Sequence, residues 1–259
     1  MKIDFHIHTE KSDDSNAKVE DIIRKAEEVG LDGIVILDHN TMQWDACSSL
    51  KETKLKVYRA GEYSTEDGHI IVIGATTPLE NICTFKSGRF ETTCILSNAK
   101  AQDAFIIMAH PYRWIHKPPS DALLSQVDAI EIYNSRNCLL RNNFDANTKA
   151  QDAAKRLNLP MLSGSDAHFV SEIGNSYVLF DTMGEPFDLK AIKRYTATIY
   201  GQPNHPIGEF KSQWIKASRY RTHTRKLKLI AKLFFELFVF VWRNNKIQKG
   251  IITTYKGAV

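Results

Sequence analysis

Short runs rich in isoleucine and valine recur through the first 200 residues, and helical patterns separate them. Several runs are almost continuously apolar, which is typical of strands buried on both faces. The runs that we interpret as strands are Lys2–His8, Gly33–Leu37, Val57–Glu62, His69–Gly74, Phe105–Ala109, Ala129–Tyr133, Met161–Ser165, Tyr177–Phe180 and Thr198–Tyr200. Strands that alternate with helices predict an α/β fold with a parallel sheet. Seven or more such units in this length favour closure into a barrel, with an open sheet as the alternative.

Helical spacing is clearest between the first two strands. In Ala17–Val29 the apolar residues recur at the interval of one helix face, with Asn16 as the candidate N-cap and Gly30 as the stop. Further helices are expected around residues 42–50, 95–103, 120–126, 145–157 and 187–194.

Polar residues that can bind metals stand where these strands end. They are His6 and His8, Asp38 and His39, Glu62, His110, Glu131 and Asn134, and Asp166 and His168. In a barrel of parallel strands the carboxyl ends meet at one rim, where side chains from several strands converge. We therefore expect a functional site at that rim.

The spacing of these residues favours metal binding. Residues two apart on a strand point the same way, so His6 and His8 can reach one ion, and Asp166 and His168 repeat the spacing. With His39, Glu62, His110 and Asp13 the set holds five histidines and three carboxylates. Such ligands suit zinc, manganese or iron, and they are too many for one tetrahedral ion. Two or three divalent ions are the expected number, and sites of this kind activate water against phosphate esters.

Other polar residues have more ordinary interpretations. His116, His205 and His223 lie in a proline-rich loop or beyond the strands, and we expect no metal there. Asp38 precedes His39, so on an extended chain it points away, and we expect it to orient a histidine through the second ring nitrogen. Glu131 could orient a ligand, contact substrate or be only structural.

The motifs as a series resemble the PHP family, named for polymerase and histidinol phosphatase domains. They are "DFHIHT…SDD", "LDHN", "GEYS", "HIIVIG", "AHPYR" and "SGSDAH", in that order over residues 4–168. The resemblance implies a distorted (β/α)7 TIM-like barrel that holds two or three metals at its C-terminal rim. The implied ligands are His6, His8, Asp13, His39, Glu62, His69, His110, Asp166 and His168. Asp14 competes with Asp13, and His69 could instead be a strand residue pointing into the barrel.

The amidohydrolase superfamily also begins with two histidines on a first strand. Its members usually need a carboxylated lysine on a middle strand, and no lysine stands at an apolar strand end here. The resemblance to the PHP family is therefore preferred.

The resemblance and the ligand set both predict a metal-dependent phosphoesterase, in which a metal-bridging hydroxide attacks phosphorus. Arg113 is placed to bind the phosphate, while Arg136 is a weaker candidate and Asn134 could contact the substrate. His39 or His168 could protonate the leaving group. We expect a small phosphomonoester, such as a nucleotide or a sugar or amino-alcohol phosphate. A nuclease acting on oligonucleotide ends, or a non-catalytic metal-binding module, are the alternatives.

Charge divides the chain. Residues 210–259 carry twelve Lys or Arg and one acid, Glu236, whereas the first 209 residues have a net charge of −7. We expect a barrel domain over 1–209 and a basic, partly apolar helical extension over 210–259. Residues 219–250 could pack on the barrel or form a dimer, lie on a membrane, or, less favoured, bind nucleic acid. The apolar run at 227–242 is shorter than the ~20 residues that cross a bilayer.

The cysteines and the first residues favour a cytoplasmic protein. Cys47, Cys83, Cys94 and Cys138 are scattered without a paired motif, so we expect reduced thiols. The chain begins on a charged strand without the pattern of a signal peptide.

Overall fold

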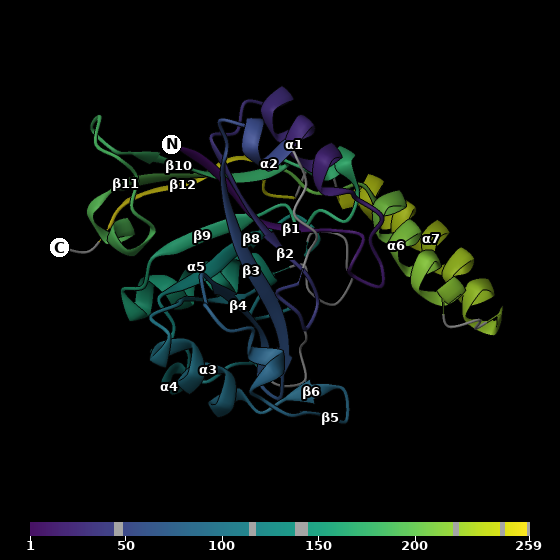
Figure 1. Ribbon diagram of the computed structural model, residues 1–259. Helices are drawn as coiled ribbons and strands as arrows, with labels where there is room; N and C mark the ends of the chain where they lie inside the picture. Colours follow the sequence, from purple (N-terminus) through teal and green to yellow (C-terminus); the bar gives the residue numbers. More distant parts are fainter. Residues whose placement is uncertain (44–48, 114–117, 138–144, 220–222, 244–246, 258–259) are drawn as a thin grey trace.

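One curled mixed sheet organises the computed structural model, which describes residues 1–43, 49–113, 118–137, 145–219, 223–243 and 247–257 (Figure 1). The strand order is β12-β11-β10-β1-β2-β3-β4-β7-β8-β9, and β6 pairs with both β3 and β5. The strands are β1 (Lys2–His8), β2 (Gly33–Leu37), β3 (Lys56–Thr65), β4 (Gly68–Ile73), β5 (Phe85–Lys86), β6 (Arg89–Phe90), β7 (Phe105–Ala109), β8 (Ala129–Asn134), β9 (Met161–Gly164), β10 (Ser176–Asp181), β11 (Thr196–Gly201) and β12 (Gly250–Lys256).

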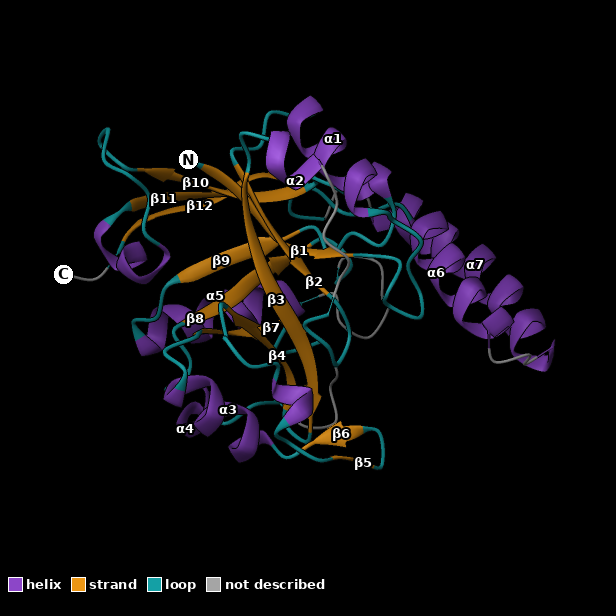
Figure 2. Cartoon of the chain, viewed as in Figure 1, coloured by secondary structure: helices purple, strands orange, loops and turns teal. Residues whose placement is uncertain are grey.

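Helices connect and cover the strands (Figure 2). They are α1 (Val19–Glu28), α2 (Ser49–Glu52), α3 (Thr92–Ala101), α4 (Asp121–Leu124), α5 (Ala146–Leu157), α6 (Pro206–Arg219) and α7 (His223–Arg243), with 3-10 turns η1 (Leu79–Asn81), η3 (Val170–Glu172) and η4 (Leu189–Arg194). Of the helix expected at 42–50, only its end is seen in α2, and residues 44–48 lie outside the described part. The N-cap of α1 is Lys18 rather than Asn16, while Gly30 adopts φ +69° just beyond the helix end, as the stop signal predicted.

The α/β class is confirmed, whereas the described residues do not confirm the expected count of seven βα units. Strands β1, β2 and β3 run parallel, as do β7, β8 and β9. Between the two sets, β3 and β4 form an antiparallel hairpin without a helix, because only residues 66–67 separate them. The sheet nevertheless curls on itself, since a parallel bridge joins Ile7 on β1 to Ala167, just after β9.

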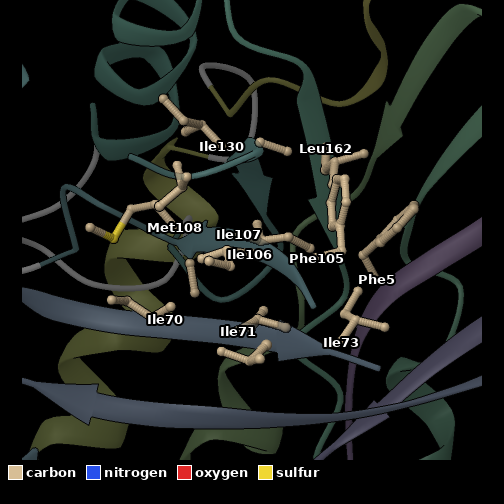
Figure 3. Packing of buried hydrophobic residues seen from close by; sticks show 14 of the residues in the cluster. Phe5, Ile70, Ile71, Ile73, Phe105, Ile106, Ile107, Met108, Ile130 and Leu162 are labelled. Atoms are coloured by element: carbon tan, nitrogen blue, oxygen red, sulfur yellow. The ribbon is translucent and has the colours of Figure 1, made fainter. Parts of the chain in front are cut away.

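The core lies inside the curl and on the faces covered by helices. Every residue of β2 and β7 is buried, as their continuous apolar sequences predicted. Phe5, Ile71, Phe105 and Ile107 belong to the main cluster of buried side chains (Figure 3). Burial on this scale anchors the strands, at roughly 1.5–3 kcal/mol per large apolar side chain, and so holds the strand ends rigidly.

The C-terminal residues do not form the separate extension expected at 210–259. Strand β12 pairs with β11 and completes the sheet edge. The hydroxyl of Tyr255 donates to the carbonyl of Met161 at 2.6 Å, and that of Tyr133 donates to Gln248 at 2.8 Å. Only α6 and α7 project from the body, as a helical pair (Figure 1). Charge alone was misleading because strand pairing depends on backbone groups and packing.

The cysteine prediction also needs correction. Cys83 and Cys94 form a disulfide with their Cα atoms 6.0 Å apart. The β5–β6 hairpin folds back between them, which their spacing in the sequence did not show. Cys47 and Cys138 lie outside the described residues. In the described part of the chain, no helix has the length and apolar character needed to span a bilayer.

Candidate metal centre

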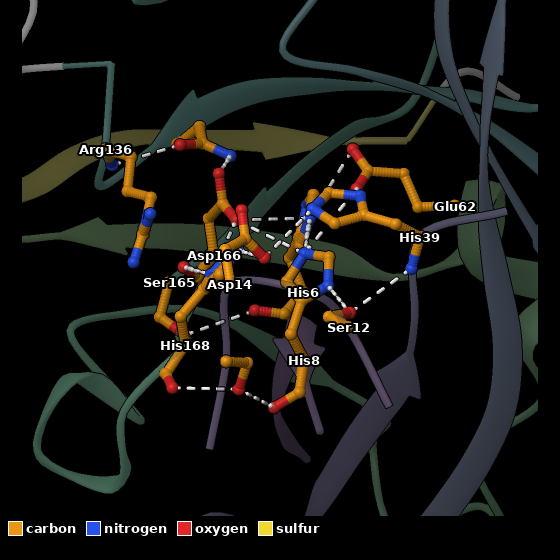
Figure 4. A network of polar contacts seen from close by, with 12 residues as sticks. His6, His8, Ser12, Asp14, His39, Glu62, Arg136, Ser165, Asp166 and His168 are labelled. Carbon is orange, nitrogen blue, oxygen red and sulfur yellow. Dashed lines mark hydrogen bonds and ion pairs between the residues drawn. The ribbon is translucent and has the colours of Figure 1, made fainter. Parts of the chain in front are cut away.

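Side chains from β1 and β3, and from just after β2 and β9, meet in one cluster (Figure 4), and His110 from just after β7 joins it through Glu62. His6 and His8 end β1, Glu62 lies on β3, His110 follows β7 and Asp166 follows β9. All five are at most 2% exposed. A cluster of imidazoles and carboxylates so deeply buried requires strong mutual compensation or a bound ion.

The imidazoles of His6 and His8 point their Nε2 atoms at each other. Nδ1 of His6 lies 3.0 Å from the Glu131 carboxylate and donates to it. Nδ1 of His8 lies 3.0 Å from the hydroxyl of Ser12. That hydroxyl gives its own hydrogen to Asp38 at 2.6 Å, so it accepts from His8. With both Nδ1 atoms protonated, two Nε2 lone pairs face each other across 3.1 Å unless one imidazole is doubly protonated.

Asp38 therefore orients a histidine by a different route than predicted. It contacts Ser12 and also accepts from the backbone N–H and hydroxyl of Thr9 at 2.9 and 2.6 Å. Ser12 is the link to His8, and no pattern in the sequence distinguished it. Glu131, whose role the sequence left open, contacts His6 directly and also accepts from the backbone N–H of His110 at 2.8 Å.

Glu62 is the hub of the cluster. Its Oε1 lies 2.8 Å from His69 Nδ1 and 2.9 Å from His110 Nε2. Its Oε2 lies 2.9 Å from His39 Nδ1 and 3.5 Å from His8 Nε2, yet it accepts no hydrogen bond of good geometry. Burial alone would raise the pKa of Glu62, but His69, His6 and His39 hold that pKa well below its usual value. The carboxylate is thus ionised and suited to binding a divalent cation.

Asp166 occupies the opposite side of the cluster. Its Oδ1 lies 3.5 Å from His6 Nε2 and 3.4 Å from His8 Nε2. The residue adopts φ +52°, a conformation that L-residues rarely take and that clusters at functional sites. The strand before this turn packs closely against β1, because a Cβ at Gly164 would lie only 2.2 Å from the Cβ of His6. The glycine of the "SGSDAH" motif thus lets β9 approach β1.

The structure distinguishes between Asp13 and Asp14. The carboxylate of Asp14 lies 3.2 Å from Nε2 of His168 and 3.5 Å from Nε2 of His39. Asp13 forms an ion pair with Lys216 at 3.0 Å instead. Asp14, and not the expected Asp13, therefore lies against the histidines of the cluster. The turn after β1 determines which of two adjacent acids points inward, and the sequence motif does not.

The imidazole and carboxylate groups of the cluster are arranged so that they can bind divalent metal ions. Four groups of three residues bring one ligand atom each within 4.8 Å of the others. They are His6–His8–Glu62, His6–His110–Asp166, His8–His39–His168 and His39–Glu62–His69. The facing Nε2 atoms and the Glu62 Oε2 that accepts no hydrogen bond are what a cation would satisfy. Burial lowers the pKa of His8 well below its usual value, helped by His168 and His39, which keeps its imidazole in the neutral form that binds metals.

Arg113 contacts the cluster directly. Its guanidinium donates to Asp166 at 2.5 Å, to Asn134 at 2.8 Å and to Asn137 at 2.9 Å. Asn134 is fully buried, and its amide also donates to Glu131 and Asp166. The structure therefore places Asn134 behind Arg113, and its contact with a substrate stays a prediction.

A cavity of about 730 Å³ opens over the cluster. His39, His168, Asp166 and Arg113 are among the residues that line it. Its outer wall includes residues that the sequence did not single out, which are Lys11, Phe85, Glu209, Gln213 and Lys216. The last three come from α6. No motif marks them, because a helix far along the chain reaches the rim only through tertiary packing.

Arg136, the weaker phosphate candidate, holds α6 in place. Its guanidinium contacts Glu209 of α6 at 2.8 Å and Glu172 of η3 at 3.4 Å. Of the histidines expected to bind no metal, His205 lies outside the cluster and packs its ring 5.5 Å from that of Phe240. His116 lies outside the described residues, and the side chain of His223 is not described.

Comparison with known proteins shows the family to which the chain belongs. The family model described as PHP-associated matches residues 144–194. An uncharacterised protein of Methanocaldococcus jannaschii is 30% identical over 205 residues, which cover 73% of this chain and 75% of the relative. The chain belongs to the PHP family. A second uncharacterised protein of that organism is 28% identical over 148 residues, covering 52% of this chain and 82% of its own length. The resemblance inferred from the motifs is thus confirmed.

Solved structures share the fold at low identity. PsfC from Pseudomonas syringae superposes with a TM-score of 0.59 at 15% identity, covering 84% of this chain and 98% of its own. An amidohydrolase from Chromobacterium violaceum, solved with bound sulfate and no metal, gives 0.51 at 14% identity over 81% and 96% of the two chains. A candidate metal-dependent phosphoesterase from Bifidobacterium adolescentis gives 0.50 at 17% identity over 64% and 87%.

Proposed function

We propose that this PHP-family chain is a metal-dependent hydrolase, and that it acts on a small phosphomonoester such as a nucleotide or a sugar or amino-alcohol phosphate. The facing Nε2 atoms of His6 and His8, beneath a cavity whose lining includes Arg113, carry the proposal. The names of two structural neighbours, a candidate metal-dependent phosphoesterase and an amidohydrolase, point to the same broad class.

Two or three divalent ions of manganese, iron or zinc, held by the clusters around Glu62 and Asp166, would supply an activated water and neutralise phosphate charge. The residues for the proposed ion near the rim are Asp14, His39 and His168. Glu131 and Ser12 orient His6 and His8 from behind, so the lone pairs stay aimed at the ions.

The cavity wall supplies the contacts to substrate. Arg113 is fixed by Asp166 and Asn134, so its planar guanidinium is preorganised for phosphate oxygens. Lys11 and Lys216 add positive charge further out. The imidazole of His39 is 22% exposed against 3% for His168, so in a state in which His39 holds no ion, it is better placed than His168 to protonate a leaving oxygen. A cavity of about 730 Å³ suits a small ligand.

The test pairs metal analysis with turnover. The protein purified with manganese, iron or zinc should hold two or three equivalents and hydrolyse p-nitrophenyl phosphate faster than bis-p-nitrophenyl phosphate. Arg113→Ala should lower kcat/KM by roughly ten- to a hundred-fold, because a charge-assisted contact to phosphate is lost. Arg156→Ala is the matched control, since Arg156 pairs with Asp121 at the surface. Full metal occupancy without hydrolysis of either ester would contradict the proposal.

A further inference from the structure

Helix α7 exposes a row of large apolar side chains that the proposed hydrolase does not use. Phe234 and Phe238 are each 69% exposed, Val241 is 76% exposed and Trp242 is 63% exposed, and Ile230 begins the row. Positions 230, 234, 238 and 241 recur at the interval of one helix face. The row is about 17 Å long, at ~1.5 Å per residue. Contiguous apolar surface of this kind marks a site of interaction.

The opposite face of α7 packs against α6. Leu229 is buried, and Phe240 packs its ring 5.5 Å from His205, which precedes α6. Glu236 is buried and forms an ion pair with Lys232 at 3.2 Å. The helix therefore has one face fixed on the protein and one face turned to solvent, projecting with α6 from the sheet (Figure 2).

Lysines follow one edge of the apolar row. Lys228 and Lys232 are exposed and one helical turn apart, next to Phe235 and Trp242 around the helix. Lysines at this edge can lay their aliphatic stems along apolar surface while the ammonium groups remain at a polar boundary. Aromatic residues also favour the boundary between lipid headgroups and acyl chains. An apolar face with a cationic edge is typical of helices that lie in a membrane interface.

We propose that α7 docks this protein onto the surface of an anionic membrane. Lys228, Lys232 and Glu236 interrupt the apolar sequence of α7, so the helix would lie in the plane of the interface rather than cross the membrane. Charge decides between the two candidate partners of this face, a second copy of the chain and a lipid surface. In a symmetric dimer the same surface faces its copy, which would bring together two segments that each carry net charge +11 over residues 210–259. An anionic lipid surface instead attracts that charge, at about 1 kcal/mol per basic residue close to it.

The experiment is sedimentation of the full chain with phospholipid vesicles. At low salt the protein should bind vesicles of phosphatidylcholine with phosphatidylserine, bind pure phosphatidylcholine much more weakly, and be released by 1 M salt. Phe234→Ser with Phe238→Ser should lower the partition coefficient on the order of ten-fold or more, because two side chains no longer enter the interface. Lys228→Glu should also weaken binding to the anionic vesicles.

Met183→Ser is the matched control, since Met183 is 76% exposed in the turn after β10 and should leave binding unchanged. Circular dichroism and metal content show that the variants remain folded. No binding to anionic vesicles at low salt would overturn the proposal. Equal binding by the Phe234→Ser, Phe238→Ser variant would do the same, as would a dimer in analytical ultracentrifugation that this variant converts to monomer.

Discussion

At the residue scale, the cluster depends on which ring nitrogen of each histidine carries its proton. Glu131 and Ser12 fix the Nδ1 protons of His6 and His8, which leaves both Nε2 atoms facing inward. Sequence spacing showed that the two histidines point the same way. The rotation of each imidazole ring depends on a hydrogen-bond partner, Ser12 for His8 and Glu131 for His6. These partners are 4 and 125 positions away, and only the folded chain brings them into contact.

Variants of the neighbouring acids Asp13 and Asp14 test which of the two carboxylates contributes to metal binding. Asp14→Asn should remove about one equivalent of bound metal and lower activity at least ten-fold, because a charged ligand beside His39 and His168 becomes neutral. Asp13→Asn should retain both, since Asp13 pairs with Lys216. Metal content by mass spectrometry and kcat/KM measure the two effects. Loss with Asp13→Asn and retention with Asp14→Asn would reverse the assignment.

At the scale of elements, most strands were predictable and the connections between them were not. The bounds of β1, β2 and β7 match the expected runs. In β2 and β7 the continuous apolar sequence identifies strands buried on both faces. The β3–β4 hairpin and the β5–β6 hairpin were missed. Two-residue links and two-residue strands leave little apolar pattern to detect.

The disulfide beside the β5–β6 hairpin gives the second prediction. Cys83→Ser should lower the free energy of unfolding by about 3 kcal/mol, because the Cys83–Cys94 link restricts a loop of this length in the unfolded chain. Urea unfolding of the oxidised protein measures the change, and metal content should stay the same because the disulfide lies outside the cluster. A reductant should have the same effect on the unmodified protein and none on the variant. An unchanged urea midpoint after Cys83→Ser would contradict the prediction.

At the scale of the whole molecule, the C-terminal residues complete both the sheet and the site. Strand β12 covers the edge of β11, and α6 provides one wall of the cavity. The charge boundary at residue 209 is therefore not a structural boundary. Arg136 donates a hydrogen bond to Ser212, and Lys216 pairs with Asp13, so both contacts cross that boundary.

Removing bound metal tests whether the cluster contributes to the stability of the whole folded chain. Chelation should lower the melting temperature, because ions that bind only the folded chain stabilise it by mass action. Apparent metal affinity should fall as pH decreases, since protons compete for the ligands. Burial opposes protonation of His6, but Asp166, Glu131 and Glu62 raise its pKa well above the usual value. The metal must therefore displace a proton from His6 at neutral pH, and each lower pH unit should weaken binding up to ten-fold. Calorimetric titration at several pH values measures this, and pH-independent binding would contradict it.

The sequence by itself determined the α/β class, the buried strands, the PHP family and a rim rich in metal-binding residues. These follow from local patterns, because apolar runs and residues two apart on a strand have one geometry wherever they occur. Only the tertiary structure decided that Asp14 rather than Asp13 faces the cluster, that Ser12 links His8 to Asp38, that α6 lines the cavity and that β12 completes the sheet. Those features depend on contacts between distant segments, which packing and backbone pairing determine and which short motifs do not record.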